Sequence, residues 1–265
     1  MTYNKYLEAV AQVDLGAYRT GAATPSLLMS EAGNLVVQYA PFDHIERNAE
    51  LVIVGLTPGR QQAANALEVL ATELKRGTAP PLALERAKRS SSFSGPMRSN
   101  LLNMLDAVGV PALYGRQTAA EFFSDADARV HFTSALRYPV FIKGENYSGS
   151  PNPLAHPMLR GMIETYLLDE ARALPKAIWI PLGQHAEAAL LHLSRTGHID
   201  RAKILAGLPH PSGANAERIA YFLGRKTRED LSAKTNADRL DLSKSALAAQ
   251  IFQLGQGAYN LEVGL

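Results

Sequence analysis

The stretch "ELVIVGLTPGRQQAANALEVL", residues 50–70, decides the fold that the sequence predicts. It begins with branched apolar residues typical of a strand buried on both faces, continues through a loop with proline and glycine, and ends with the apolar spacing of a helix. A strand that passes through a short loop into a helix is the first half of a βαβ unit. The stretch therefore predicts a parallel sheet covered by helices.

Further apolar runs of the same kind indicate more strands of this sheet, and segments with helical spacing lie between them. The runs cover residues 129–136, 176–182 and 203–209, and the helical segments after residue 77 cover 97–110, 153–174 and 184–197. This alternation predicts an α/β fold of three layers, α/β/α, with a central, mostly parallel four-stranded sheet.

The 265 residues fit one domain, 1–265, with a core at about 50–224 and an extension at each end. We expect the N-terminal extension to wrap the edge of the sheet, and residues 241–260 to form a helix packed on the domain. The extensions are thus expected to belong to the same unit as the core.

The composition excludes several classes of protein. The chain has no cysteine, which rules out disulfides, thiolate metal sites, iron–sulfur clusters and a cysteine nucleophile. No secretory signal or membrane-spanning run is apparent, so we expect a cytoplasmic protein without a membrane partner. The net charge of +2 argues against indiscriminate binding of nucleic acid. The local cluster "RAKRSSSFSGPMR", residues 86–98, is either a phosphate-binding stretch or a solvated loop.

Motifs with loop-forming or polar residues follow three of the expected strands. They are "GLTPG" at 55–59, "TSALRYP" at 133–139 and "LPHPSGAN" at 208–215. In open parallel sheets, ligands bind beyond the carboxyl ends of the strands. Because these loops meet at one edge of the sheet, we expect a ligand site there.

These motifs resemble, in the same order, those of the uracil-DNA glycosylase superfamily, particularly its bacterial and archaeal branches that carry an iron–sulfur cluster. The resemblance covers about residues 50–224 and includes "VGLTPG", "SSFSGPMRSNLLNMLDAVGV", "FTSALRYP", "IPLGQHAEAALL" and "LPHPSG". It implies a DNA glycosylase that flips a base out of DNA and hydrolyses its N-glycosidic bond, with DNA as its partner. The cluster cysteines are absent, so we expect no cofactor and no metal, and a monomer is favoured.

The resemblance implies a role for each matching residue. Phe93 would stack on the flipped base, although packing in the core is the alternative for this ring. His210 would donate a hydrogen bond to the departing base, and Thr57 would position a water. The base would also contact Ser134, Gly55 and Leu56. Residues expected at DNA phosphates are Pro58, Gly59, Arg60, Arg98, Ser212, Gly213 and Asn215.

Two departures from the family pattern bear on activity and substrate. Thr57 stands where the family has a water-activating carboxylate or amide. The water is then either held by Thr57 without a general base or activated by an acid from elsewhere, such as Asp43 or Glu145. Ser134 stands where an asparagine reads the edge of uracil, which predicts a different base. A modified pyrimidine, for example a phage-type modified cytosine excised in defence, suits the added room.

Small residues follow "HPSG", so Asn215 or Arg218 would fill the gap that the flipped nucleotide leaves. His185 and His192 lie on one expected helix face but have no third metal ligand nearby, and His131 is expected to be a core histidine. These assignments leave the site without a metal.

Three other functions stay open. The chain could be a non-catalytic DNA-binding module on the same fold, as Thr57 and Ser134 suggest, or a conventional uracil-DNA glycosylase in base-excision repair. A nucleotide-metabolising enzyme is disfavoured because the chain has neither "GxGxxG" nor a phosphate-loop lysine motif.

Overall fold

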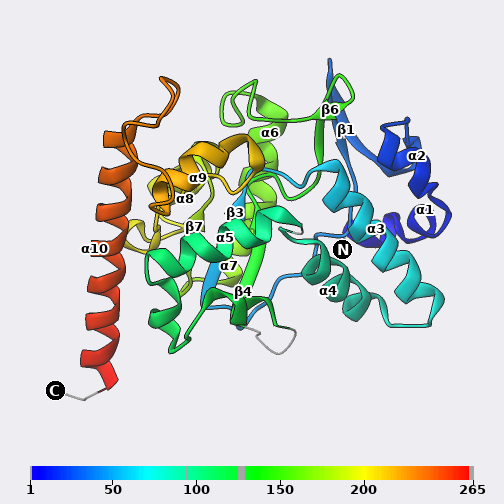
Figure 1. Cartoon of the computed structure of the whole chain (residues 1–265). Helices are drawn as coiled ribbons and strands as arrows, with labels where there is room; N and C mark the ends of the chain where they lie inside the picture. Colours follow the sequence, from blue (N-terminus) through cyan, green and yellow to red (C-terminus); the bar gives the residue numbers. More distant parts are fainter. Residues whose placement is uncertain (1, 94, 125–128, 263–265) are drawn as a thin grey trace.

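The central sheet is parallel and has three strands in the order β4-β3-β7. The computed structural model that shows it describes residues 2–93, 95–124 and 129–262 (Figure 1). Ile53 of the middle strand lies opposite Phe132 on one side and Ile180 on the other. The strands are β3 (Leu51–Gly55), β4 (Val130–Ser134) and β7 (Ile178–Pro181).

The expected fourth strand, 203–209, joins this sheet through a single bridge, so the prediction of four strands was one too many. Ile204 pairs with Trp179, and Leu205 donates its backbone N–H to the Trp179 carbonyl at 2.8 Å. The ladder ends there because Gly207 has a φ of +124° and Pro209 has no N–H to donate. The three-layer α/β architecture itself is confirmed.

Alternate residues of the strands enter two separate hydrophobic clusters, one on each face of the sheet. Leu51 and Ile53 belong to one cluster, whereas Val52 and Val54 belong to the other. A strand whose two faces are both covered needs apolar residues at every position, which is why these segments read as continuous apolar runs.

Helices on both faces complete the layers. The face with Val52 and Val54 is covered by α3 (Arg60–Lys75), α4 (Pro80–Ser91), α6 (Pro157–Met162), the π-helical turn η5 (Ile163–Leu167), α7 (Leu168–Ala173) and α8 (Gln184–Arg195). The other face is covered by α5 (Pro96–Ala107), η3 (Val110–Tyr114), η4 (Ala119–Phe123), α9 (Ala216–Phe222) and α10 (Ala237–Glu262). Short 3-10 turns η6 (Arg201–Lys203) and η7 (Gly213–Asn215) precede α9.

The N-terminal extension packs on α3 and supplies two strands of a second, antiparallel sheet in the order β1-β2-β5-β6. Its helical elements are η1 (Thr2–Lys5), α1 (Leu7–Gln12), α2 (Leu15–Thr20) and η2 (Pro25–Leu27). The strands are β1 (Leu28–Ala32), β2 (Leu35–Gln38), β5 (Val140–Ile142) and β6 (Glu145–Asn146).

The basic stretch 86–98 is not a solvated loop. Its first part belongs to α4, and Lys88 is only 2% exposed. Arg86 pairs with Glu73 at 2.5 Å. The helix was missed because few of its residues are apolar, while a buried cation supplies part of its inner face.

The C-terminal helix α10 runs along one side of the molecule, where Figure 1 shows it as a long red helix. Leu247 and Ile251 are buried against the second cluster, so the expected packing of this helix on the domain is confirmed. Within the described residues, each helix is too short or too polar to cross a lipid bilayer.

Candidate functional site

A cavity of about 1060 Å³ opens at the carboxyl ends of the three parallel strands. The loops after β3, β4 and β7 and the segment 207–215 all contribute to its wall. This is the edge where the motifs were expected to meet. Residues that were predicted from the sequence and line this cavity are Gly55, Leu56, Thr57, Pro58, Gly59, Phe93, Ser134, His210, Ser212 and Asn215.

Phe93 is placed at the cavity by the end of α4. Its side chain is 6% exposed and packs edge-on against Phe132, with ring centroids 5.9 Å apart, so the ring is part of the core, the alternative named for it above. One side of the ring nevertheless faces the cavity. A Cβ atom at Gly55 would lie 3.4 Å from the ring. Glycine at this strand end therefore leaves space for the ring of Phe93.

His210 is held in one protonation state and one orientation. The backbone N–H of Ser212 donates to Nδ1 of His210 at 3.3 Å, which leaves the proton of the neutral ring on Nε2. Burial lowers the pKa of His210 and so favours this neutral form. Asn100 of α5 donates to the Pro211 carbonyl at 2.9 Å and fixes the loop. The histidine can therefore act as a neutral hydrogen-bond donor.

Thr57 lies in the cavity wall, but its hydroxyl already has two backbone partners. It donates to the Tyr138 carbonyl at 3.1 Å and accepts from the Val140 N–H at 3.2 Å. These bonds tie the loop after β3 to the chain that follows β4. The remaining lone pair can accept a hydrogen bond from a water, but the hydroxyl has no further proton to donate.

Two cavity residues at the end of β4 were not picked out from the sequence. Thr133 is 6% exposed, and its Oγ1 has no hydrogen-bond partner within the described part of the chain. Arg137 donates to Glu170 at 2.9 Å and to the Tyr166 carbonyl at 2.7 Å. A buried hydroxyl without a partner is costly, so a ligand that bonds Thr133 would relieve that cost. Nothing in the sequence distinguishes this threonine from its neighbours.

The two arginines expected at phosphates, Arg60 and Arg98, are bonded to groups of the protein itself. Arg60 donates to the carbonyls of Tyr18 and Gly144 and stacks over the Phe141 ring at 4.2 Å. Arg98 donates to the Ser92 carbonyl at 3.1 Å. Neither lines the cavity, whereas Gly213 is exposed in the turn beside it.

The acids considered for water activation lie outside the cavity wall. Asp43 is enclosed by the hydroxyls of Tyr39 and Tyr138 at 3.0 and 2.8 Å, and burial raises its pKa. Glu145 is exposed in β6. Among the described residues that line the cavity, the carboxylate is Glu187, in the first turn of α8.

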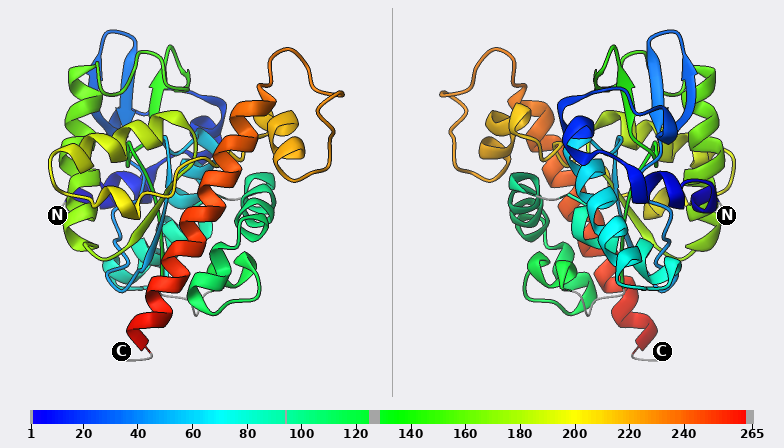
Figure 2. Two further views of the ribbon diagram at one scale, coloured as in Figure 1. Left: turned by 90° about the vertical axis from the view of Figure 1, so that its left-hand side faces the viewer. Right: turned by 90° about the vertical axis from the view of Figure 1, so that its right-hand side faces the viewer.

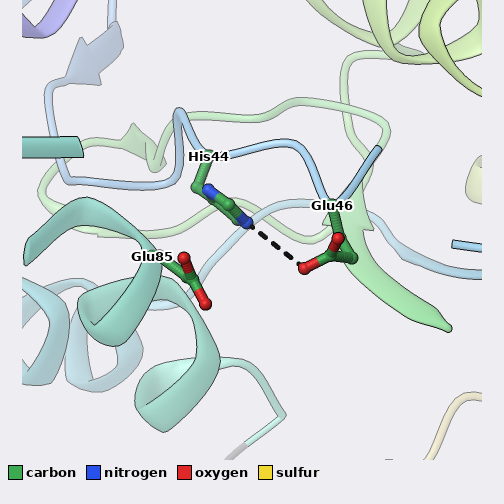
Figure 3. A group of neighbouring side chains, drawn as sticks. All are labelled: His44, Glu46 and Glu85. Atoms are coloured by element: carbon green, nitrogen blue, oxygen red, sulfur yellow. Dashed lines mark ion pairs between the residues drawn. The ribbon is translucent and has the colours of Figure 1, made fainter. Parts of the chain in front are cut away.

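A separate group of side chains could in principle hold a metal ion. His44, Glu46 and Glu85 place one ligand atom each within 4.8 Å of one another, outside the cavity wall (Figure 3). The group already has cations: Arg89 pairs with Glu85 at 3.4 Å, and Lys88 donates to the His44 carbonyl at 2.6 Å. These charges compete with a metal for the carboxylates.

The other histidines have different surroundings. His192 contacts Glu164 at 2.9 Å, whereas His185 lines the cavity. His131 is buried in β4, as expected of a core histidine, and its Nε2 lies 3.7 Å from Glu170.

Comparisons with known proteins extend this picture. A model of the uracil DNA glycosylase superfamily matches residues 42–238. The chain is also 32% identical, over 246 residues, to the uncharacterized protein YoxB of Bacillus subtilis (strain 168), and the alignment covers 90% of this chain and 94% of that protein. No solved structure matches the chain.

Proposed function

The chain belongs to the uracil-DNA glycosylase superfamily, and we propose that it is a DNA glycosylase that takes an unusual base out of the stack and removes it. The observation that carries this proposal is the meeting of Phe93, Thr57 and His210 in one cavity. Enzymes that act on a base cannot reach it within the duplex, so they need a pocket with a stacking surface and hydrogen-bonding groups.

In the proposed reaction, the bond between C1′ of the sugar and the base nitrogen breaks, and its electron pair leaves with the base. The Nε2–H of His210 donates a hydrogen bond to the oxygen of the base, where negative charge develops. Water adds to C1′, loses a proton to a basic group and leaves an abasic site. Because His210 is neutral and held by its loop, this donor needs little reorganisation.

We propose Glu187 as the group that accepts the proton from this water, directly or through a second water. It is the carboxylate in the described cavity wall, and Thr57 cannot act as a base near neutral pH. Glu187→Gln should then slow base release by about a hundredfold or more. Unchanged release by this variant would leave a held water without a general base as the mechanism.

The proposed substrate is a modified pyrimidine, such as a phage-type modified cytosine, and the proposed role is defence. The end of β4 offers the hydroxyls of Thr133 and Ser134 to the base, in place of a single longer amide. At about 1060 Å³, the cavity is also at the upper end of ordinary ligand pockets, which hold about 300–1000 Å³. Both features suit a base with an added group.

A panel of oligonucleotides tests the proposal. Each would carry uracil, a mismatched thymine, hypoxanthine, 5-hydroxymethylcytosine or its glucosylated form, and released bases would be identified by mass spectrometry. We expect release of a modified pyrimidine by the wild type and its loss in His210→Ala. Release of uracil alone would instead support conventional base-excision repair.

The competing function is a non-catalytic DNA-binding module on the same fold. The observation that favours it is the Thr57 hydroxyl, whose only proton is already donated to a backbone carbonyl. Tight DNA binding with no base released from any member of the panel would support this alternative and contradict the proposed hydrolysis.

A further inference from the structure

Positive side chains dominate the charged part of the cavity wall. Within the described residues, the cations there are Arg137, Arg218, Lys234 and Arg239, against the carboxylate of Glu187. Arg137 is buried and paired with Glu170, whereas the other three cations are exposed. This excess of exposed positive charge at a cavity mouth attracts anions.

Lys234 and Arg239 belong to residues 225–243, which we call the C-terminal wall. It comprises the segment after α9 and the first part of α10, and Figure 2 shows that segment as an orange loop standing out beside α9. None of these residues was assigned to the site from the sequence.

Two carboxylates of the C-terminal wall and one of α9 are held in ion pairs with cations of the same wall. Arg228 contacts Asp238 at 2.5 Å and Asp241 at 2.7 Å, and Lys226 contacts Glu217 at 2.7 Å. The contact with Lys226 and the hydroxyl bonds hold the pKa of Glu217 well below its usual range, so this group stays ionised and paired. These acids therefore do not neutralise the cations that face the cavity.

No carboxylate pairs with Lys234 or Arg239 anywhere in the part of the chain that the structure describes, and both side chains are exposed. Arg218 donates to Asn215 at 2.8 Å and toward the Lys234 carbonyl at 3.4 Å. The three cations thus line one part of the cavity wall from α9, the following segment and α10.

The C-terminal wall is also seated directly on the loop that carries His210. A Cβ atom at Gly207 would lie 3.1 Å from the Ser243 carbonyl oxygen, and Gly207 has a φ of +124°. Glycine is therefore needed here both for the turn and for the close approach of α10. An anion bound at the wall would lie beside the groups proposed to act on the base.

We propose that the C-terminal wall binds phosphates of the DNA strand whose base enters the cavity, with Lys234, Arg239 and Arg218 as the contacts. This inference rests on the proposed function, because it takes the ligand to be DNA. A strand fits better than a free nucleotide, since three cations from α9, the following segment and α10 can contact more than one phosphate, whereas a single phosphate needs fewer cations.

The test compares the double variant Lys234→Gln/Arg239→Gln with Lys176→Gln/Arg195→Gln. The second pair removes the same charge from exposed positions outside the cavity wall. Binding of a fluorescent oligonucleotide would be followed by anisotropy between about 50 and 200 mM salt. Each lost phosphate contact lowers the salt slope by about 0.7–0.9, so the first pair should lower it by about 1.4–1.8.

The control pair should bind like the wild type, and free deoxynucleotide monophosphates should compete poorly with the oligonucleotide. An unchanged slope in the first pair, an equal loss in the control pair, or equal competition by the free nucleotide would overturn the proposal. Circular dichroism would show that each variant is folded.

The binding test is separate from the test of base release. If binding weakens as expected in Lys234→Gln/Arg239→Gln but the wild type releases no base, the phosphate contacts are supported and the glycosylase is rejected. Base release with an unchanged salt slope would support the glycosylase and reject the phosphate contacts.

Discussion

At His210, the backbone N–H of Ser212 and the burial of the ring both act against protonation. The pKa of a free histidine is near 6.5, and burial places that of His210 lower. Base release should therefore stay constant as the pH falls to 6.5 and should decrease only below it. Single-turnover release measured across the acid range checks this expectation.

Two variants separate the hydrogen bond from the titration. His210→Asn retains a donor that does not titrate, so it should retain part of the activity and lose the part of the acid decrease that comes from His210. His210→Ala should lose activity at every pH. An acid decrease that begins above pH 6.5 in the wild type would contradict a donor held in the neutral form.

Thr133 offers a prediction in which stability and activity change in different directions. Thr133→Val keeps the shape of the side chain and removes a buried hydroxyl that lacks a partner in the described chain. The variant should be as stable as the wild type, or more stable by about 1 kcal/mol. If the hydroxyl bonds the base, release should slow by about tenfold or more, because the partner atom of the base is left unpaired.

Urea unfolding and single-turnover release measure the two effects on the same preparations. Ser134→Ala removes the other hydroxyl that the end of β4 offers to the base, at a less buried position, so it should slow release without the gain in stability. A destabilised Thr133→Val with unchanged base release would show that the hydroxyl serves the fold rather than a ligand.

A buried ion network joins α4, β4 and α7, and its Arg137 lines the cavity. Glu170 is fully buried and lies 2.9 Å from Arg137 and 3.7 Å from both Lys88 and His131. Burial and the nearby charge of Lys88 lower the pKa of His131 to about 4. Because the network contains Arg137, its state bears on the cavity as well as on stability.

His131 predicts how the stability of the protein depends on pH. The unfolded chain binds a proton at this histidine near pH 6.5, but the folded chain does so only near pH 4. Its contribution to stability is therefore complete above pH 6.5 and is lost as the pH falls toward 4, by about 3 kcal/mol. Urea unfolding at several pH values should show a weaker pH dependence in His131→Gln than in the wild type. The same dependence in both would contradict this assignment.

The elements differ in how well the sequence predicted them. The strands of the parallel sheet were predicted because a strand covered on both faces reads as an unbroken apolar run, as 51–54 does. Helix α4 was missed because the buried Lys88 looks like a surface residue unless Glu170, far away in the sequence, is known to lie opposite.

Over the whole molecule, the cavity collects residues from both faces of the sheet and from the C-terminal helix. The sequence predicted Thr57, after β3, and Ser134, at the end of β4, because parallel strands bring their carboxyl ends to one edge, and it predicted His210 from the motif that ends residues 203–209. It did not predict Lys234 or Arg239, since their position depends on how α10 packs against Gly207. Charge in a sequence does not show which cations are already paired.

Because one ligand would contact all of these elements, DNA binding should stabilise the whole fold rather than one loop. An oligonucleotide with a non-cleavable analogue of the excised nucleotide, present at about a hundred times its Kd, stabilises the folded state by about 2.7 kcal/mol. For a chain of this size, that predicts a rise in Tm of about 5–10 °C. Differential scanning fluorimetry should show this rise in the wild type and a smaller one in Lys234→Gln/Arg239→Gln at the same DNA concentration. If the analogue leaves the Tm of the wild type unchanged at these concentrations, DNA does not bind the folded state in preference to the unfolded chain, which would contradict the proposed binding.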